Sequence, residues 1–96
     1  MENRIYDLLK GVIDPEVNLN IIDLGLVYDI NVSESNIIIT MTLSAKGCPL
    51  GDTIMEAVEY SVKNEYPSFN VNVNLVWEPE WNPSLISNEG KKQLGL

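Results

Sequence analysis

One stretch decides the fold of this chain: Thr40–Leu50, with the sequence TMTLSAKGCPL, in which an alternating apolar strand runs into a short loop. Gly47 suits a sharp reversal of the chain, and Pro49 suits the first position of a helix, where its missing N–H costs nothing. These residues predict a helix start with Cys48 at or next to the N-cap. Unpaired N–H groups at a helix start favour a thiolate, which is both a nucleophile and a metal ligand. Cys48, the only cysteine, is therefore the first candidate for chemistry, and inert burial is the alternative.

The segments on both sides of this stretch predict three strands and a helix. Residues 37–44 and residues 26–32 each alternate between apolar and polar, and the polar residues 33–36 between them predict an antiparallel hairpin. A stripe of apolar residues at helical spacing predicts a helix over residues 49–64. Residues 69–77 alternate again, so the chain should form a third strand after a parallel crossover.

The two ends of the chain each predict a helix. Apolar residues recur at helical spacing over residues 2–12, and Pro15 disfavours helical geometry just beyond. Ser87 can cap a last helix that runs to Leu94, with Gly90 weakening it and Gly95 ending it. The order α-β-β-α-β-α predicts an α+β fold, a two-layer sandwich with helices on one face of a small mixed sheet. We expect one domain over residues 1–96.

The connection between the first helix and the first strand holds three carboxylates within ten residues, those of Asp14, Glu16 and Asp23. A loop of this length in a small domain is more often functional than idle. The alternative is structural, with Asp14 in a helix-terminating turn and Asp23 in an Asx-type turn before Gly25. The topology brings Cys48 to the edge of the sheet where this loop is expected to lie.

Two tryptophans alternate with two prolines in the segment Trp77–Pro83. Prolines stop strand pairing, so the third strand should end there. The preferred interpretation is that both indoles close the open end of the core, because an aromatic side chain buries a large area. The alternative is an apolar wall beside the cysteine or a surface for a partner.

Charge and composition exclude several classes of function. Six basic and fourteen acidic residues give a net charge of -8, which opposes contact with nucleic acid or anionic membranes. The N-terminus lacks the pattern of a signal peptide, so we expect a cytoplasmic protein. With no histidine and one cysteine, the chain cannot build a tetrahedral zinc site from Cys and His alone. Any metal would be shared with carboxylates, a small thiol, a partner or a second subunit.

Five motifs in order carry a family resemblance: Asp14-Pro15-Glu16, Asp23–Tyr28, Thr42-Leu43, Gly47-Cys48-Pro49 and Trp77–Trp81. Together they resemble the SufT/PaaD-like family of small iron-sulfur cluster assembly proteins, which is related to the eukaryotic MIP-type component. The resemblance implies a factor that assists insertion or transfer of clusters, rather than an enzyme. It also implies a site that gathers Asp14, Glu16, Thr42, Ser44 and Cys48. Where the family often has two threonines before the cysteine, this chain has Ser44 and Ala45.

The resemblance implies iron or a labile iron-sulfur cluster that is handled rather than kept, since a permanent cluster normally needs several cysteines. Cys48 would be ligand or exchange thiol, and the expected partners are assembly or carrier proteins and client apoproteins, with a homodimer as one arrangement. Two alternatives stay open. One is an adaptor that docks through Trp77, Trp81 and the acidic surface. The other is an enzyme with Cys48 as nucleophile, Asp14 or Glu16 as base and Thr42 as oxyanion donor.

Overall fold

The structure is a computed structural model that describes residues 1–44 and 50–96. Its elements, in chain order, are α1 (Glu2–Leu9), β1 (Ile13–Asp14), β2 (Leu19–Asn20), β3 (Val27–Val32), β4 (Asn36–Met41), α2 (Gly51–Glu65), β5 (Asn70–Leu75), the 3-10 helix η1 (Pro83–Leu85) and α3 (Asn88–Leu94). Within these described ranges, no helix has the length and apolar character needed to cross a membrane.

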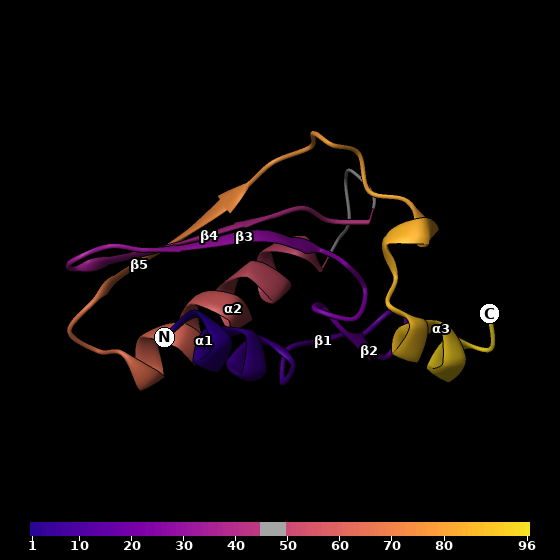
Figure 1. Cartoon of the computed structure of the whole chain (residues 1–96), viewed down its shortest axis with the longest axis horizontal. Helices are drawn as coiled ribbons and strands as arrows, with labels where there is room; N and C mark the ends of the chain where they lie inside the picture. The colour runs from indigo at the N-terminus through magenta and orange to yellow at the C-terminus, as the bar shows by residue number, and fades with distance from the viewer. Residues whose placement is uncertain (45–49) are drawn as a thin grey trace.

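The main sheet has the strand order β3-β4-β5. β3 pairs antiparallel with β4, and β4 pairs parallel with β5 across the α2 crossover. In Figure 1, α1 and α2 lie on one side of this sheet, while α3 lies beyond its end, beside β2. The predicted α+β fold with a mixed sheet is confirmed.

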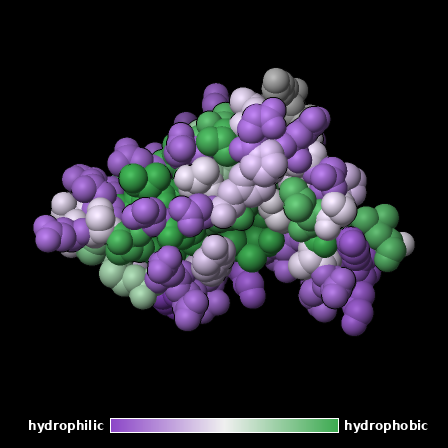
Figure 2. All heavy atoms as spheres, turned by 45° about the horizontal axis from the view of Figure 1, so that its top comes forward, coloured by the Kyte–Doolittle hydropathy of each residue, from purple (hydrophilic) through white to green (hydrophobic). Residues whose placement is uncertain are grey.

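The core lies between the sheet and the two helices. In β4, Ile37, Ile39 and Met41 are fully buried, whereas Ile38 between them is exposed, as the alternation of a strand requires. Ile54, Val58 and Val62 of α2 bury the facing stripe at helical spacing. Figure 2 brings the uncovered face of the sheet forward and shows hydrophilic atoms with hydrophobic ones between them.

Several boundaries differ from the prediction. Helix α1 ends at Leu9 rather than at residue 12, because the N–H groups of Gly11 and Val12 bond to carbonyls three residues back in a tightened last turn. Helix α2 begins at Gly51, with Leu50 as N-cap, and the predicted first position, Pro49, lies outside the described residues. The predicted N-cap residue, Cys48, lies outside the described residues.

β4 ends at Met41 instead of Ser44, and this changes which residues are buried. The predicted alternation placed Thr42 on the outer face with Ile38, but Thr42 is 1% exposed. Beyond the end of a strand, side chains no longer alternate between faces, so Thr42 and Leu43 are both buried. β5 is also shorter than predicted, at Asn70–Leu75.

The loop after α1 contains a short hairpin that the sequence did not predict. β1 pairs antiparallel with β2, through Ile13 with Asn20 and Asp14 with Leu19. Asn18 closes the turn with a positive φ of 56° and donates its N–H to the Asp14 carbonyl at 2.8 Å. Asn is one of the few residues that adopts this conformation readily.

The C-terminal segment packs over the same loop. The last helix is capped as predicted, because the Ser87 hydroxyl accepts from the Gly90 N–H and Gly95 ends the helix with a φ of 76°. Gly90 was predicted only to weaken this helix, but close packing explains why a glycine stands at this position. A Cβ on it would lie 2.9 Å from Ile86 Cγ2 and 3.0 Å from Leu19 Cδ2. A larger residue would push α3 away from β2.

Candidate functional site

A series of backbone hydrogen bonds joins the end of β4 to the acidic loop. The Thr42 N–H donates to the Leu26 carbonyl at 2.8 Å, Leu26 N–H donates to Ile21 at 3.0 Å, and Ile21 N–H donates to Val12 at 3.0 Å. Asp14 follows two residues after Val12. The chain continues toward Cys48 from this same end of β4, and the position of Cys48 relative to the acidic loop stays a prediction.

Asp14 and Glu16 are tied to each other within this loop. Asp14 is 4% exposed, and its Oδ1 accepts the N–H of Glu16 at 2.9 Å. Glu16 itself is exposed. Since α1 ends at Leu9, Asp14 does not stop a helix, and the predicted helix-terminating turn is wrong. A buried carboxylate thus lies two residues from an exposed one, so this turn offers two carboxylates of different accessibility.

Thr42 and Ser44 lie on the way to the cysteine but in different environments. Thr42 is buried, and its hydroxyl makes one long contact of 3.5 Å to the Leu43 carbonyl, at the outer limit for a hydrogen bond. Ser44 is exposed. Its hydroxyl is thus accessible to a ligand from solvent, whereas the Thr42 hydroxyl is accessible only to a group held inside the fold.

Asp23 has two structural partners. Its Oδ2 accepts from Asn20 Nδ2 at 2.7 Å, and its Oδ1 accepts from the Ser87 hydroxyl at 2.8 Å. These two hydrogen bonds, in that order, and the charge of Lys10 lower the pKa of Asp23 below its ordinary value against the opposing effect of burial. The Asx-type turn is centred on Asn20, whose Oδ1 accepts the Asp23 N–H at 2.9 Å, and not on Asp23 as predicted.

Cys48 lies outside the described residues, so its predicted role as ligand or exchange thiol stays a prediction. The described start of α2 is consistent with a site for negative charge. Gly51, the first residue of α2, is buried and has no side chain to block the helix start. Asp52 adds one carboxylate to the same turn, which opposes a second negative charge.

Tyr28, which ends the motif Asp23–Tyr28 and was predicted as part of the alternating strand, has a further role in the structure. Its hydroxyl donates to the Pro79 carbonyl at 2.7 Å and so joins the start of β3 to the chain beyond β5. Burial, and then the charge of Glu78, raise the pKa of Tyr28. No local pattern signals this contact, because 51 residues separate its two ends.

The tryptophans pack against the core, as the preferred interpretation predicted. Both are half-buried, and Trp81 Nε1 donates to the Leu24 carbonyl at 2.7 Å. Trp81 thus connects the C-terminal segment to the acidic loop. This use of the indole disfavours an adaptor that docks through a freely exposed tryptophan.

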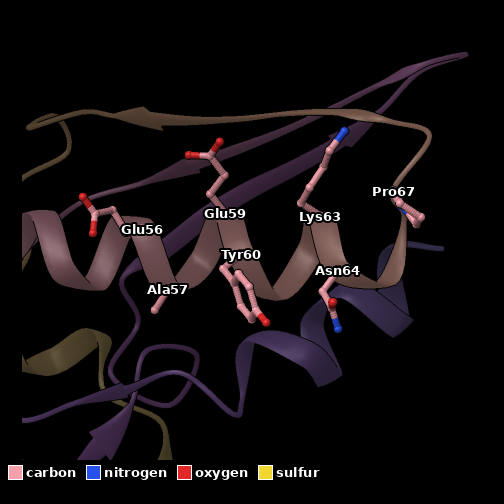
Figure 3. A pocket seen from close by; sticks show the side chains of 7 residues that line it. All are labelled: Glu56, Ala57, Glu59, Tyr60, Lys63, Asn64 and Pro67. Carbon is pink, nitrogen blue, oxygen red and sulfur yellow. The ribbon is translucent and has the colours of Figure 1, made fainter.

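The part of the chain that the structure describes contains no group of three or more Cys, Asp or Glu residues placed to hold a metal ion. A large hollow of about 770 Å³ lies on the outer side of α2 and the turn after it (Figure 3). Its described lining includes Glu56, Tyr60 and Lys63 but no predicted site residue. The hollow therefore does not coincide with the predicted site, which stays a prediction.

The chain is similar to proteins of known class over its whole length. A family model described as "Iron-sulfur cluster assembly protein" matches residues 2–75. A "Fe-S protein maturation auxiliary factor" of Porphyromonas gingivalis is 39% identical over 96 residues, which is 99% of this chain and 91% of that protein. "Fe-S protein maturation auxiliary factor SufT" of Staphylococcus aureus is 40% identical over 87 residues, covering 88% of this chain and 98% of that protein.

The fold agrees with the sequence comparison. The crystal structure of a domain of unknown function from Bacillus anthracis matches with a TM-score of 0.92 and 39% identity, over 99% of this chain and 92% of that one. The family model ends at residue 75, where β5 ends, while the similarity to whole proteins continues through α3. The chain belongs to the family of iron-sulfur cluster assembly proteins.

Proposed function

We propose that this chain is a cytoplasmic maturation factor that holds iron or a labile iron-sulfur cluster only during transfer to client apoproteins. Membership of the family gives the general role in iron-sulfur cluster assembly. The finer proposal concerns the ligands: Cys48 as ligand or exchange thiol, with Asp14 and Glu16 as neighbouring carboxylates. Carrier or assembly proteins would deliver the cluster, which is cargo and not a resident cofactor.

The observation that carries this proposal is the backbone connection from Thr42 through Leu26 and Ile21 to Val12. It fixes the acidic turn to the end of β4, from which the Cys48 loop leaves. A thiolate and two carboxylates are a mixed donor set, which binds iron more weakly than the four thiolates of a permanent cluster. Weak ligation suits a protein that must release its cargo.

The ligand count also supports a shared site. One thiol per chain cannot supply the several cysteines that a cluster normally uses, so a second subunit, a carrier protein or a small thiol must complete it. The Asp14 carboxylate is prepared for such a role, because Glu16 N–H occupies its Oδ1 and fixes its orientation. Asp23 and Ser44 would support the site, Asp23 by anchoring the loop.

The test is anaerobic reconstitution with iron and sulfide, read by visible absorption and by iron content per chain. The wild type should show thiolate-to-iron charge-transfer bands, and Cys48→Ala should lose them. Asp14→Asn keeps the acceptor for Glu16 N–H but loses the charge, so it should fold and bind less iron. Asp29→Asn, an exposed change on β3, is the matched control and should bind iron like the wild type.

Equal iron content in wild type and Cys48→Ala would contradict direct ligation by the thiol. An enzyme would instead turn over an activated thioester in a Cys48-dependent way while binding no iron. Because the chain has no histidine to serve as general base, we favour the transfer factor.

A further inference from the structure

The two edges of the main sheet differ in how they resist pairing with another chain. β3 has an irregular register between Val27 and Asp29, and Asp29 places an exposed charge on that edge. Bulges and charges are the usual means by which proteins block an edge strand. β5, with the sequence NVNVNL, has no charge and no proline, and its register with β4 is unbroken over all six residues. The β5 edge is thus left open to pairing.

The backbone groups at this edge can be identified from the pairing with β4. Asn70 N–H donates to the Ser35 carbonyl at 2.8 Å, and Val76 N–H donates to the Met41 carbonyl at 2.9 Å. The backbone amides of the even-numbered residues therefore point toward β4. Successive residues of a strand direct their amide groups to opposite sides. The amides and carbonyls of Val71, Val73 and Leu75 therefore point outward. Within the described residues, 1–44 and 50–96, no strand pairs with β5 on that side.

A groove runs along this edge between β5 and α2. Hollows of about 310 Å³ and 400 Å³ share Glu59, Val71 and Asn72 in their lining, so they adjoin. Val71 and Val73, both half-buried, form the apolar part of the groove on the β5 side. The groove thus offers an apolar surface next to unpaired backbone groups, which is what an added strand needs.

The α2 wall of the groove is acidic. Asp52, Glu56 and Glu59 line it, and Figure 3 shows Glu56 and Glu59 on the side of α2 that faces β5. Lys63 is the one described cation in the lining of these two hollows, and its Nζ already donates to the Phe69 carbonyl at 2.5 Å. The charge of the groove is therefore negative and favours a basic occupant.

We propose that the β5 edge binds an extended basic segment of a partner protein, which adds a fourth strand beside β5 with alternate Lys or Arg side chains against Asp52, Glu56 and Glu59. The spacing fits this arrangement. Alternate residues of a strand lie about 6.6 Å apart, and the four residues from Asp52 to Glu56 rise about 6 Å along α2. Basic side chains at every second residue of the added strand can thus reach carboxylates along α2.

A second copy of this chain is a poorer occupant of the same edge. Pairing of two β5 strands would bring the acidic walls of two α2 helices toward each other, in chains that each have a net charge of -8. Like charges across an interface cost free energy and suppress association. The same charge attracts a basic partner.

The test measures binding of the synthetic peptide acetyl-Lys-Val-Lys-Val-Lys-Val-amide to the full chain, by fluorescence anisotropy and by ¹⁵N NMR. Two N-methylated forms carry the methyl groups on the lysines or on the valines. Only one set of amides can face β5, so one form should lose at least about tenfold in affinity while the other keeps it. The amides of Val71, Val73 and Leu75 should gain protection from hydrogen exchange.

The charge contribution is tested with two double variants of equal net charge. Glu56→Lys with Glu59→Lys should weaken binding at least about tenfold, whereas Asp7→Lys with Asp29→Lys, both exposed and outside the groove lining, should weaken it less than about threefold. Equal binding of both N-methylated forms, equal effects of the two double variants, or unchanged Val71 protection would overturn the proposal. If the β5 amides are protected from hydrogen exchange in concentrated protein without peptide, the edge binds a second copy of the chain, and this result would also overturn the proposal.

Discussion

The carbonyl of Leu85 lies against the Cα of Gly25: a Cβ built on Gly25 would be 2.4 Å from Leu85 O. The two residues are 60 positions apart, and their contact is where the C-terminal segment closes over the acidic loop. Gly25 also has a φ of 78°, a conformation that L side chains rarely adopt. Close approach and backbone conformation thus both require glycine at this position.

Gly25→Ala should lower the free energy of unfolding by at least about 2 kcal/mol, because it adds a clash with backbone to the cost of a positive φ. Gly95→Ala is the matched control: Gly95 has a φ of 76°, but nothing lies within 4 Å of its Cβ position. That variant should lose only about 1 kcal/mol. Urea denaturation of both measures the difference, and equal losses would contradict the role of the Leu85 contact.

Asp23→Asn should reduce stability at neutral pH and less so in acid. Hydrogen bonds from Asn20 and Ser87 lower the pKa of Asp23 in the folded state, so its stabilising contribution is present above the unfolded pKa of about 4. That contribution is lost as the pH falls through the lower folded pKa. The variant and the wild type should therefore approach each other in stability as the pH falls through and below the lowered folded pKa of Asp23.

Chemical denaturation of Asp23→Asn at pH 7 and in acid, against the wild type at each pH, makes this comparison. Asp29→Asn serves as the control, since Asp29 is an exposed residue of β3. A pH-independent difference for Asp23→Asn would mean that the geometry of its partners, and not its charge, matters.

Trp81→Phe should cost about 1 to 2 kcal/mol. The change removes the 2.7 Å hydrogen bond to the Leu24 carbonyl and leaves that acceptor without its donor, while most of the aromatic packing remains. Tyr60→Phe, at a side chain that is 70% exposed, should leave stability unchanged. Thermal unfolding of both variants measures this. A neutral Trp81→Phe would show that the loop does not depend on the indole N–H.

Patterns that extend over six or more residues predicted the fold. Very short strands and contacts between residues far apart in the sequence were not predicted. Alternation over Ile37, Ile39 and Met41 identified the core face of β4 because each strand of the sheet has six residues. The hairpin of β1 and β2 was missed, because strands of two residues contain no measurable period. Thr42 was assigned to the wrong face because the alternation stops where the strand stops.

The candidate site was predicted from motifs, and its environment was not. Asp14 and Glu16 were found from the Asp-Pro-Glu motif of the family resemblance, but Asp14 is buried in a hairpin that was not foreseen. Asp23 was interpreted through its neighbours in sequence, whereas one of its two partners, Ser87, is 64 residues away. Sequence reasoning identifies residue types suited to iron, and it does not reach contacts that the tertiary fold creates.

Thr42→Val separates a structural hydroxyl from one that serves the site. The Thr42 hydroxyl makes only a 3.5 Å contact to Leu43, so its removal should change stability by less than about 1 kcal/mol. If the hydroxyl contributes to the proposed site, iron content after reconstitution should fall while the fold persists. Thr40→Val, a half-buried threonine in β4 two residues earlier, is the control and should bind iron normally. Wild-type iron content in Thr42→Val would remove Thr42 from the site and leave Asp14, Glu16 and Cys48 as the proposed ligands.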